Sequence, residues 1–298
     1  MIHVFGSINI DYSVKTAHLP KPGETVAGQS LILTPGGKGA NQALAARRAG
    51  AMVSMHGATG SDSVADNALS LLTADGVDLS RVKKVAGPTG CAFVFVDDNS
   101  ENQIVIISGA NAEVTPADAS SISYRKDDIL LLQLECPIES VITAASHAKK
   151  NKAKVILNTA PYQSIDKAVF KTIDYLIINE TEAQLLASDL KLSDNRAKTI
   201  AAATGCSVIK TLGENGVEAV DERSEVFALP GINVDAVDTV GAGDTFAGFL
   251  GAMLGTTDSL QNACKVANAA AALACTKPGA QSAIPTLSDV RHLAGSKQ

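Results

Sequence analysis

A glycine-rich segment near the carboxyl end of the sequence, residues 238–244 (DTVGAGD), ends in a carboxylate at Asp244. Gly241 and Gly243 would let backbone N–H groups approach an anion, which a helix dipole also attracts. A carboxylate beside a phosphate is unfavourable unless it takes up a proton or works with a metal ion, so Asp244 is a candidate base for an attacking hydroxyl. On these residues alone, an N-cap carboxylate in a simple turn is an equally good explanation. A helix is predicted to follow, because apolar residues recur at helical spacing at Phe246, Phe249, Leu250, Met253 and Leu254.

A second glycine-rich segment, residues 36–41 (GGKGAN), precedes a predicted helix of small residues over 42–49. By itself it favours a tight turn that allows the helix to pack closely. It is not a Walker A loop, because GxxxxGK followed by Ser or Thr occurs nowhere in the sequence. No GxGxxG follows the first predicted strand, where residues 5–9 read FGSIN. The sequence therefore argues against P-loop proteins and against Rossmann dehydrogenases.

Polar residues or a glycine follow several predicted strands at the point where each strand ends. In open parallel sheets, ligands bind at the carboxyl ends of the strands. One such residue is usually a turn former, but several of them beside two glycine-rich helix starts favour a binding site. The residues are Asn9 and Asp11, then Glu135, then Asn179 and Glu182, and finally Thr211 and Gly213.

Short apolar runs alternate with helical patterns through most of the chain. The run over 129–134 (ILLLQL) is nearly continuous, as in a strand that is covered on both faces. This alternation predicts an α/β fold with a doubly wound, mainly parallel sheet and helices on both faces, in a single domain over residues 1–298. The last four residues are expected to be a frayed end. Further strands are expected at 3–8, 155–157, 175–178 and 207–209, and helices at 41–49, 62–74, 139–149, 181–187 and 197–203.

Four strand-like segments are too close together in sequence to enclose crossover helices, namely 11–15, 25–33, 91–96 and 102–107. They are predicted to form a small antiparallel sheet beside the main one, a lid that covers a site, a partner or both. Because little nearby chain could cover both faces, we expect a symmetric homodimer joined through the lids. The apolar side chains concerned are Val14, Val26, Leu31, Leu33, Phe93, Phe95, Ile104 and Ile106.

The composition also excludes several classes of protein. The chain has 298 residues and a formal net charge of −6, which argues against binding along a nucleic-acid backbone or an anionic membrane. No apolar run approaches the ~20 residues that span a bilayer, and the N-terminus lacks the pattern of a signal peptide. We expect a soluble cytoplasmic protein with reduced thiols, since no CxxC spacing occurs among Cys91, Cys136, Cys206, Cys264 and Cys275.

Taken together, the two glycine-rich segments resemble the signature motifs of the ribokinase family of carbohydrate kinases (PfkB type). Residues 37–43 (GKGANQA) and 238–244 (DTVGAGD) carry the resemblance, and the first is most similar to the ribokinases of that family. Two ordered motifs with matching segments between them are far more specific than either motif alone. The other matching segments are 7–11 (SINID), 22–25 (PGET), 133–137 (QLECP), 179–182 (NETE), 210–213 (KTLG) and 277–281 (KPGAQ).

The resemblance implies roles for individual residues. Asp244 corresponds to the catalytic base, with an anion hole for the γ-phosphate formed by Gly241, Ala242 and Gly243. The positions that hold the sugar in the family are matched by Asn9, Asp11, Gly37, Lys38, Gly39, Ala40, Asn41 and Glu135, together with Asp244. The positions that contact ATP are matched by Asn179, Thr211, Leu212, Gly213, Glu214, Asn215, Gly216, Gly243 and Asn268.

The resemblance also implies two kinds of metal ion. Glu182 matches a position that acts on Mg²⁺ indirectly, and a K⁺-binding loop is matched by Asp238, Val240, Ala274, Lys277, Gly279 and Ala283. Backbone carbonyls at fixed distances suit K⁺. Two positions depart from the family pattern: Asn268 stands where ribokinases often have His beside the adenine, and Ala283 stands where a Ser hydroxyl often contributes to the cation site.

The activity that the resemblance implies is ATP-dependent phosphorylation of the primary hydroxyl of a small sugar, with D-ribose giving D-ribose 5-phosphate. Mg²⁺ would accompany ATP and K⁺ would activate the enzyme. Two alternatives remain: a kinase of the same family for fructose, 2-deoxyribose or a nucleoside, and a sugar- or nucleotide-binding regulator without chemistry. The intact GAGD motif ending at Asp244 argues against the regulator.

Overall fold

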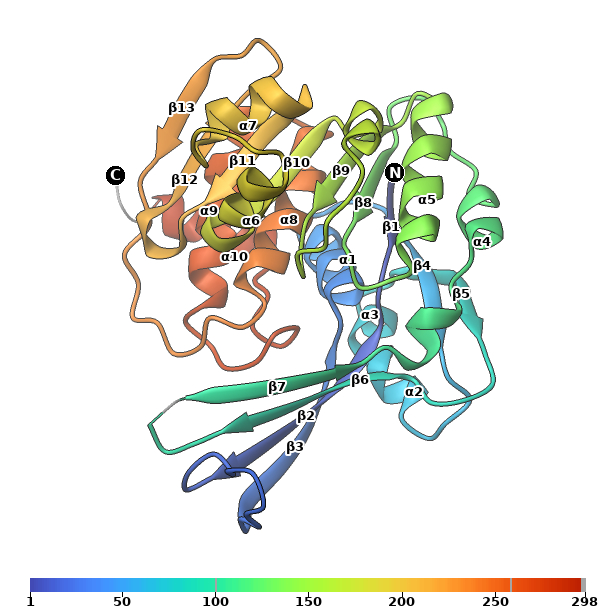
Figure 1. Cartoon of the computed structure of the whole chain (residues 1–298), viewed down its shortest axis with the longest axis vertical. Helices are drawn as coiled ribbons and strands as arrows, with labels where there is room; N and C mark the ends of the chain where they lie inside the picture. Colours follow the sequence, from blue (N-terminus) through green and yellow to red (C-terminus); the bar gives the residue numbers. More distant parts are fainter. Residues whose placement is uncertain (100, 258, 296–298) are drawn as a thin grey trace.

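The computed structural model describes residues 1–99, 101–257 and 259–295. Of the end that we expect to be frayed, residues 295–298, only residue 295 lies within these ranges. Nine strands form the main sheet in the order β13-β12-β11-β10-β9-β8-β1-β4-β5 (Figure 1). All neighbouring pairs are parallel except β11–β12 and β12–β13. The prediction of a mainly parallel α/β sheet is confirmed. Its strands are β1 (Ile2–Phe5), β4 (Val53–Thr59), β5 (Asp78–Lys84), β8 (Ile129–Leu132), β9 (Lys154–Asn158), β10 (Tyr175–Asn179), β11 (Ser207–Thr211), β12 (Val217–Val220) and β13 (Val226–Leu229).

Helices cover both faces of this sheet, and each face has its own apolar core. In β8, Leu131 joins the core on one face, while Leu130 and Leu132 join the core on the other. This explains the nearly continuous apolar run, because alternate side chains of a buried strand serve two cores. The first core contains side chains of α1 (Lys38–Arg48), α2 (Ala65–Ala68), α3 (Ser70–Ala74), α8 (Ala242–Leu254), α9 (Leu260–Ala274) and α10 (Leu287–Gly295). The second contains those of α4 (Pro116–Ser120), α5 (Ile138–Lys150), α6 (Glu180–Asp189) and α7 (Ala197–Thr204).

A second sheet, the lid, projects beyond the carboxyl end of β1 (Figure 1). Its strand order is β3-β2-β6-β7, formed by β2 (Asn9–Thr16), β3 (Gly28–Gly36), β6 (Gly90–Val96) and β7 (Asn102–Ile107). The expected antiparallel pairing holds for β2–β3 and β6–β7, but β2 and β6 are parallel. The physical reason is the length of the connection, since a parallel pair requires a long crossover and β2 and β6 are separated by α1, β4 and β5.

The structure differs from the sequence-based expectation at two further places. The first strand ends at Phe5, and after three residues the chain enters β2 of the lid at Asn9, so one continuous stretch joins the main sheet to the lid. The segment expected as one helix over 62–74 forms two short helices, α2 and α3. Within the described ranges, no helix is long and apolar enough to cross a membrane.

Candidate active site

The helix α8 begins with the GAGD segment, and the Asp244 side chain lies buried in its first turn. Gly241 is the N-cap residue, so the alternative in which Asp244 is the N-cap is wrong. No side chain of the described residues caps this helix. The first N–H groups of a helix have no intrahelical partner and attract anions. The Asp244 carboxylate accepts hydrogen bonds from Asn41 Nδ2 (2.9 Å, to Oδ2) and from Gln42 Nε2 (3.0 Å, to Oδ1). The two glycine-rich segments thus meet at this carboxylate.

The start of α1 is held against the junction between the main sheet and the lid. Gly37 has a φ of 87°, and a Cβ atom there would lie 2.8 Å from the backbone nitrogen of Asn9, so only glycine fits. Glu135, which follows β8, accepts hydrogen bonds from Ser7 Oγ (2.5 Å) and from the backbone N–H of Lys38 (3.1 Å). These contacts gather the ends of β1 and β8, the start of β2 and the start of α1 at one edge of the sheet.

Three carboxylates and one lysine share this edge and influence one another by charge. Burial raises the pKa of Asp11 to about 7, and the charges of Glu135 and Asp244 add to that rise. Burial also raises the pKa of Glu135, against the lowering effect of Lys38. The pKa of Lys38 is raised chiefly by Asp244, against the effect of its burial. The Lys38 ammonium group therefore interacts with these three carboxylates and with Glu182, which is a suitable setting for a polyol that can bridge such groups.

A cavity of about 380 Å³ adjoins this cluster and is lined by Asn9, Glu135 and, from the lid, Ile106. Asn9 accepts a hydrogen bond at Oδ1 from Nδ2 of the buried Asn111 (2.7 Å). Asn111 also accepts from the N–H of Ile8 and donates to its carbonyl, so it fixes the backbone at the entry to β2. Sequence reasoning missed Asn111, and only its place directly after the second hairpin could have drawn attention to it.

Most residues predicted for ATP lie at the carboxyl ends of β10 and β11, whereas Gly243 lies at the start of α8 and Asn268 lies on α9. Asn179 and Glu182 form a reciprocal capping box at the start of α6, with both Glu182 oxygens hydrogen bonded to Asn179. Thr211 ends β11, and residues 212–216 form a tight turn closed by a bond from the N–H of Leu212 to the carbonyl of Gly216. Asn268, on α9, donates to the carbonyl of Pro230 at 3.0 Å. The capping box gives Asn179 and Glu182 a structural role in addition to any contact with nucleotide.

The two segments predicted for a monovalent cation lie side by side. Val237 and Asp238 donate their N–H groups to the carbonyl of Cys275, and the Asp238 carboxylate accepts the N–H groups of Val240 and Gly279. Asp238 thus organises both loops, while Ala283 is buried and supplies no hydroxyl. The Ser282 hydroxyl next to it donates to the carbonyl of Pro278.

No group of three or more His, Cys, Asp or Glu side chains that could hold a metal ion occurs among the described residues. Glu182 feels the charges of Lys38 and Asp244, so it belongs to the same electrostatic environment. Since its two oxygens already accept hydrogen bonds, Glu182 suits a divalent cation that is bound mainly by phosphate and water.

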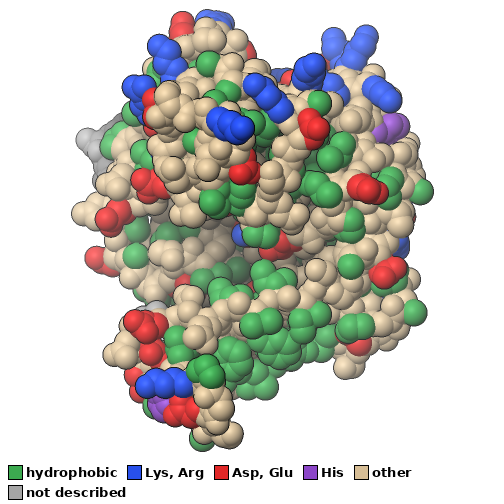
Figure 2. All heavy atoms as spheres, in the orientation of Figure 1, with side chains coloured by type: hydrophobic (Ala, Val, Ile, Leu, Met, Phe, Trp, Pro, Cys, Tyr) green, Lys and Arg blue, Asp and Glu red, His purple; other side chains and the backbone are tan. Residues whose placement is uncertain are grey.

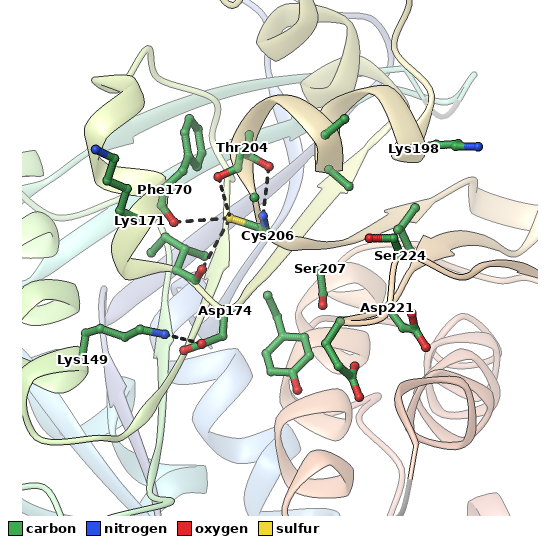
Figure 3. Close-up of a pocket in the computed structure, with 17 residues that line it drawn as sticks. Lys149, Phe170, Lys171, Asp174, Lys198, Thr204, Cys206, Ser207, Asp221 and Ser224 are labelled. Atoms are coloured by element: carbon green, nitrogen blue, oxygen red, sulfur yellow. Dashed lines mark hydrogen bonds and ion pairs between the residues drawn. The ribbon is translucent and has the colours of Figure 1, made fainter.

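The structure also contains a cavity of about 620 Å³ at the other edge of the sheet, near the amino ends of β10 and β11 (Figure 3). Its charges balance, because three lysines and three carboxylates line it, and Lys149 is paired with Asp174. The other charged residues are Lys171, Lys198, Asp221 and Glu222. Burial raises the pKa of the Cys206 thiol beside it to about 11. None of the predicted site residues lines this cavity.

Comparison with known proteins identifies the family of this site. A model of the pfkB family of carbohydrate kinases matches residues 1–287. The chain belongs to this family. A ribokinase of Haemophilus influenzae is 40% identical over 292 residues, covering 95% of this chain and 94% of that protein. The predicted family and enzyme class are therefore confirmed, and the chain is a carbohydrate kinase.

Solved structures support the same assignment. A ribokinase from Thermotoga maritima superposes on this kinase with a TM-score of 0.92 at 34% identity, covering 99% of both chains. An Arabidopsis thaliana ribokinase, solved with ribose and ATP, has a TM-score of 0.86 at 28% identity and covers 98% of this chain and 97% of its own. The lid and the main sheet of this kinase are thus both part of the shared fold.

Proposed function

We propose that this kinase transfers the γ-phosphoryl group of ATP to the primary hydroxyl of D-ribose, giving D-ribose 5-phosphate. The observation that carries the proposal is the meeting of Asp244, at the uncapped start of α8, with the sugar-binding segment at Asn41. This contact supports the proposal because Asp244 is a buried carboxylate in the first turn of a helix, where anions are attracted. The ribokinases among its relatives support ribose as the acceptor.

The proposed roles follow from the contacts at this edge. Asp11 and Lys38 bind sugar hydroxyls, and so does Asn41, whose buried Oδ1 has no hydrogen-bond partner among the residues that the structure describes. The hydroxyl oxygen attacks the γ-phosphorus while the bond to the β-phosphate oxygen breaks and ADP leaves with that electron pair. Asp244 takes the proton of the hydroxyl, and the N–H groups at Gly241–Gly243 stabilise the negative oxygens of the transferred group.

Two cations belong to the proposal. The carboxylate of Glu182 would act on Mg²⁺ through water, and Mg²⁺ when bound neutralises charge on the phosphates. The loops held together by Asp238, residues 237–240 and 274–279, would present carbonyl oxygens to K⁺, although Ala283 offers no hydroxyl. We expect ATP turnover to require Mg²⁺ and to rise when K⁺ replaces Na⁺ at constant ionic strength. Equal rates in the two salts would contradict the K⁺ site.

The lid is the proposed dimer interface, and its strand register divides its side chains between two faces. Asp11 pairs with Ala92, and Ala92 with Ile106, which lines the cavity, so these residues share the inner face. The outer face therefore carries the stacked rings of Tyr12 and Phe93, 5.0 Å apart, with Leu33, Phe95 and Val105 around them. Figure 2 shows apolar side chains gathered on the lid and a hollow between the lid and the body. An apolar face of this kind favours a symmetric partner.

Light scattering at micromolar concentration tests the dimer. We expect twice the chain mass of 30.6 kDa, and we expect Phe93→Asp to give the monomer because its charge lies on the outer face. Ile104→Asp, on the inner face, is the matched control and should remain dimeric. A monomeric wild-type protein would contradict the proposal, and a dimer that survives Phe93→Asp would place the contact elsewhere.

A substrate panel tests the reaction itself. Initial rates with ATP and Mg²⁺ are compared for D-ribose, 2-deoxyribose, fructose and a nucleoside, and kcat/KM is expected to be highest for D-ribose. A higher value for another acceptor would keep the kinase and reassign its substrate, and no turnover with any of them would contradict the proposed function.

We also propose a cytoplasmic location, which the five free cysteines support.

A further inference from the structure

A set of buried amide side chains connects the Asp244 carboxylate to the core. Gln42 is fully buried and donates from Nε2 to Asp244 Oδ1 (3.0 Å) and to Asn158 Oδ1 (3.1 Å). Its own Oε1 accepts from Gln133 Nε2 at 2.7 Å. Both amide hydrogens and the carbonyl oxygen of Gln42 are therefore used, and its side chain is held in one orientation. Burial of an amide costs free energy unless its polar atoms find partners, as those of Gln42 do.

We propose that Gln42 is a positioning residue for phosphoryl transfer. It holds Asp244 Oδ1, so that Oδ2 faces the sugar and accepts the proton of the attacking hydroxyl. This inference rests on the proposed function, in which Asp244 is the base. The two oxygens have different surroundings: Oδ2 is bound by Asn41, which belongs to the sugar-binding segment, whereas Oδ1 is bound by a residue whose other contacts lie in the core.

Close packing of α1 on α8 keeps Gln42 in contact with Asp244. At Gly248, one turn after Asp244, a Cβ atom would lie 2.5 Å from both the Cβ of Ala45 and the carbonyl oxygen of Gln42. No larger residue fits there, and the two helices approach at this point. Asn158 in turn donates to the carbonyl of Ile177, in β10, at 3.3 Å. The amide of Gln42 is therefore fixed by the main sheet as well as by its own helix.

An amide suits this position better than a cation would. A neutral N–H donor orients the carboxylate, whereas a lysine or arginine there would also stabilise its ionised form and weaken it as a base. A fixed orientation matters because proton transfer and attack depend on geometry, and small misplacements of reacting groups reduce rates strongly. Gln42 thus affects the chemical step more than the binding of sugar or ATP.

The test uses two substitutions at this position and a control on the same helix. Gln42→Met keeps the volume and removes the hydrogen bond to Asp244 together with those to Asn158 and from Gln133. We expect kcat to fall by about 10–100-fold, with KM for sugar and ATP changed less than about twofold. Gln42→Glu places a second carboxylate against Asp244, and because two adjacent carboxylates retain a proton, the acidic limb of the kcat–pH profile should move up by about one pH unit or more. Leu44→Ala, buried in the core and away from the site, should lower the melting temperature and keep kcat.

The outcomes separate this inference from the proposed function. The positioning role would be overturned if kcat of Gln42→Met lay within about threefold of kcat of Leu44→Ala. It would also be overturned if the kcat–pH profile of Gln42→Glu were unshifted. The rates are measured with whichever sugar the unaltered protein phosphorylates best, and absence of turnover with every sugar would contradict the proposed function instead. A third measurement does not depend on activity, because it compares melting temperatures. The double variant of Gln42→Met and Asp244→Ala should lose less in melting temperature than the sum of the two single losses. A loss equal to that sum would contradict the inference.

Discussion

The protonation of Asp11 is expected to control sugar affinity between mildly acidic and neutral pH. Burial and the charges of Glu135 and Asp244 raise the pKa of Asp11 from 3.8 to about 7. If sugar hydroxyls donate to the ionised carboxylate, only the deprotonated protein binds sugar well. KM for ribose should then rise about tenfold for each pH unit below 7, and reach about 30 times its alkaline value near pH 5.5.

The assay is a set of initial rates at saturating ATP and Mg²⁺ over this pH range, with KM and kcat determined separately. The control is Asp11→Asn, which cannot ionise, so its KM should be high and independent of pH. A wild-type KM that is flat from about pH 5.5 to 8, or an acid rise that persists in Asp11→Asn, would refute the assignment to Asp11. The second outcome would point to Glu135, whose pKa is also raised by burial.

The same shift predicts that Asp11 destabilises the folded protein at neutral pH. Between pH 3.8 and about 7 the folded protein keeps a proton on Asp11 that the unfolded chain has lost, so the free energy of unfolding falls as pH rises through this window. Above this pH window, the ionised Asp11 lowers the free energy of unfolding by at most about 4 kcal/mol. Asp11→Asn should therefore raise the melting temperature near pH 8 and change it little near pH 4. Equal melting temperatures of variant and wild type near pH 8 would contradict this.

Two further substitutions test other groups. Asp244→Asn should lower kcat by about 10²–10⁴-fold while the dissociation constant for sugar changes far less, and near-full kcat would exclude Asp244 as the base. Burial, together with the charge of His3, lowers the pKa of His56 to about 3. Below pH 6.5 the unfolded chain therefore binds a proton at His56 that the folded protein does not bind. The free energy of unfolding falls as pH decreases from 6.5 to about 3. At about pH 5 this amounts to about 2 kcal/mol, and denaturant unfolding of His56→Gln should show an acid loss smaller by that amount; an equal loss in both proteins would contradict the shift.

The fold and the two glycine-rich segments could be predicted because their evidence is local. The nearly continuous apolar run of β8 reflects burial on both faces, and the residue types of GGKGAN and GAGD suit a helix start beside an anion. The pairing of β2 with β6 could not be predicted, since it depends on which strands meet across a long connection. The face of the lid that carries Phe93 became clear only from strand register, because the lid sequences alternate imperfectly.

The roles of Asn111 and Gln42 could not be assigned from the sequence for a different reason, although Gln42 lies within the 37–43 segment. A single amide residue in a chain has no period or spacing that distinguishes a buried anchor from a turn former or a surface group. Their roles arise from partners far away in sequence: Gln42 meets Asp244 across 202 positions, and Asn111 meets Asn9 across 102. Buried amides of this kind are found by following hydrogen bonds from a site residue in three dimensions.

The proposed sugar site combines residues of α1 and α8 with a residue of the lid. Lys38 and Asn41 belong to α1, which packs closely on α8 at Gly248, and Asn41 donates a hydrogen bond to Asp244. Asp11 belongs to β2, in a sheet that is anchored to the body mainly at its inner end. Movement of the lid would therefore change the distance from Asp11 to the sugar but not the distance from Asn41 to the base. Substitutions in the lid should therefore act mainly on KM, whereas substitutions between α1 and α8 should act mainly on kcat. Comparing KM and kcat of Asp11→Asn with those of Gln42→Met tests this difference directly.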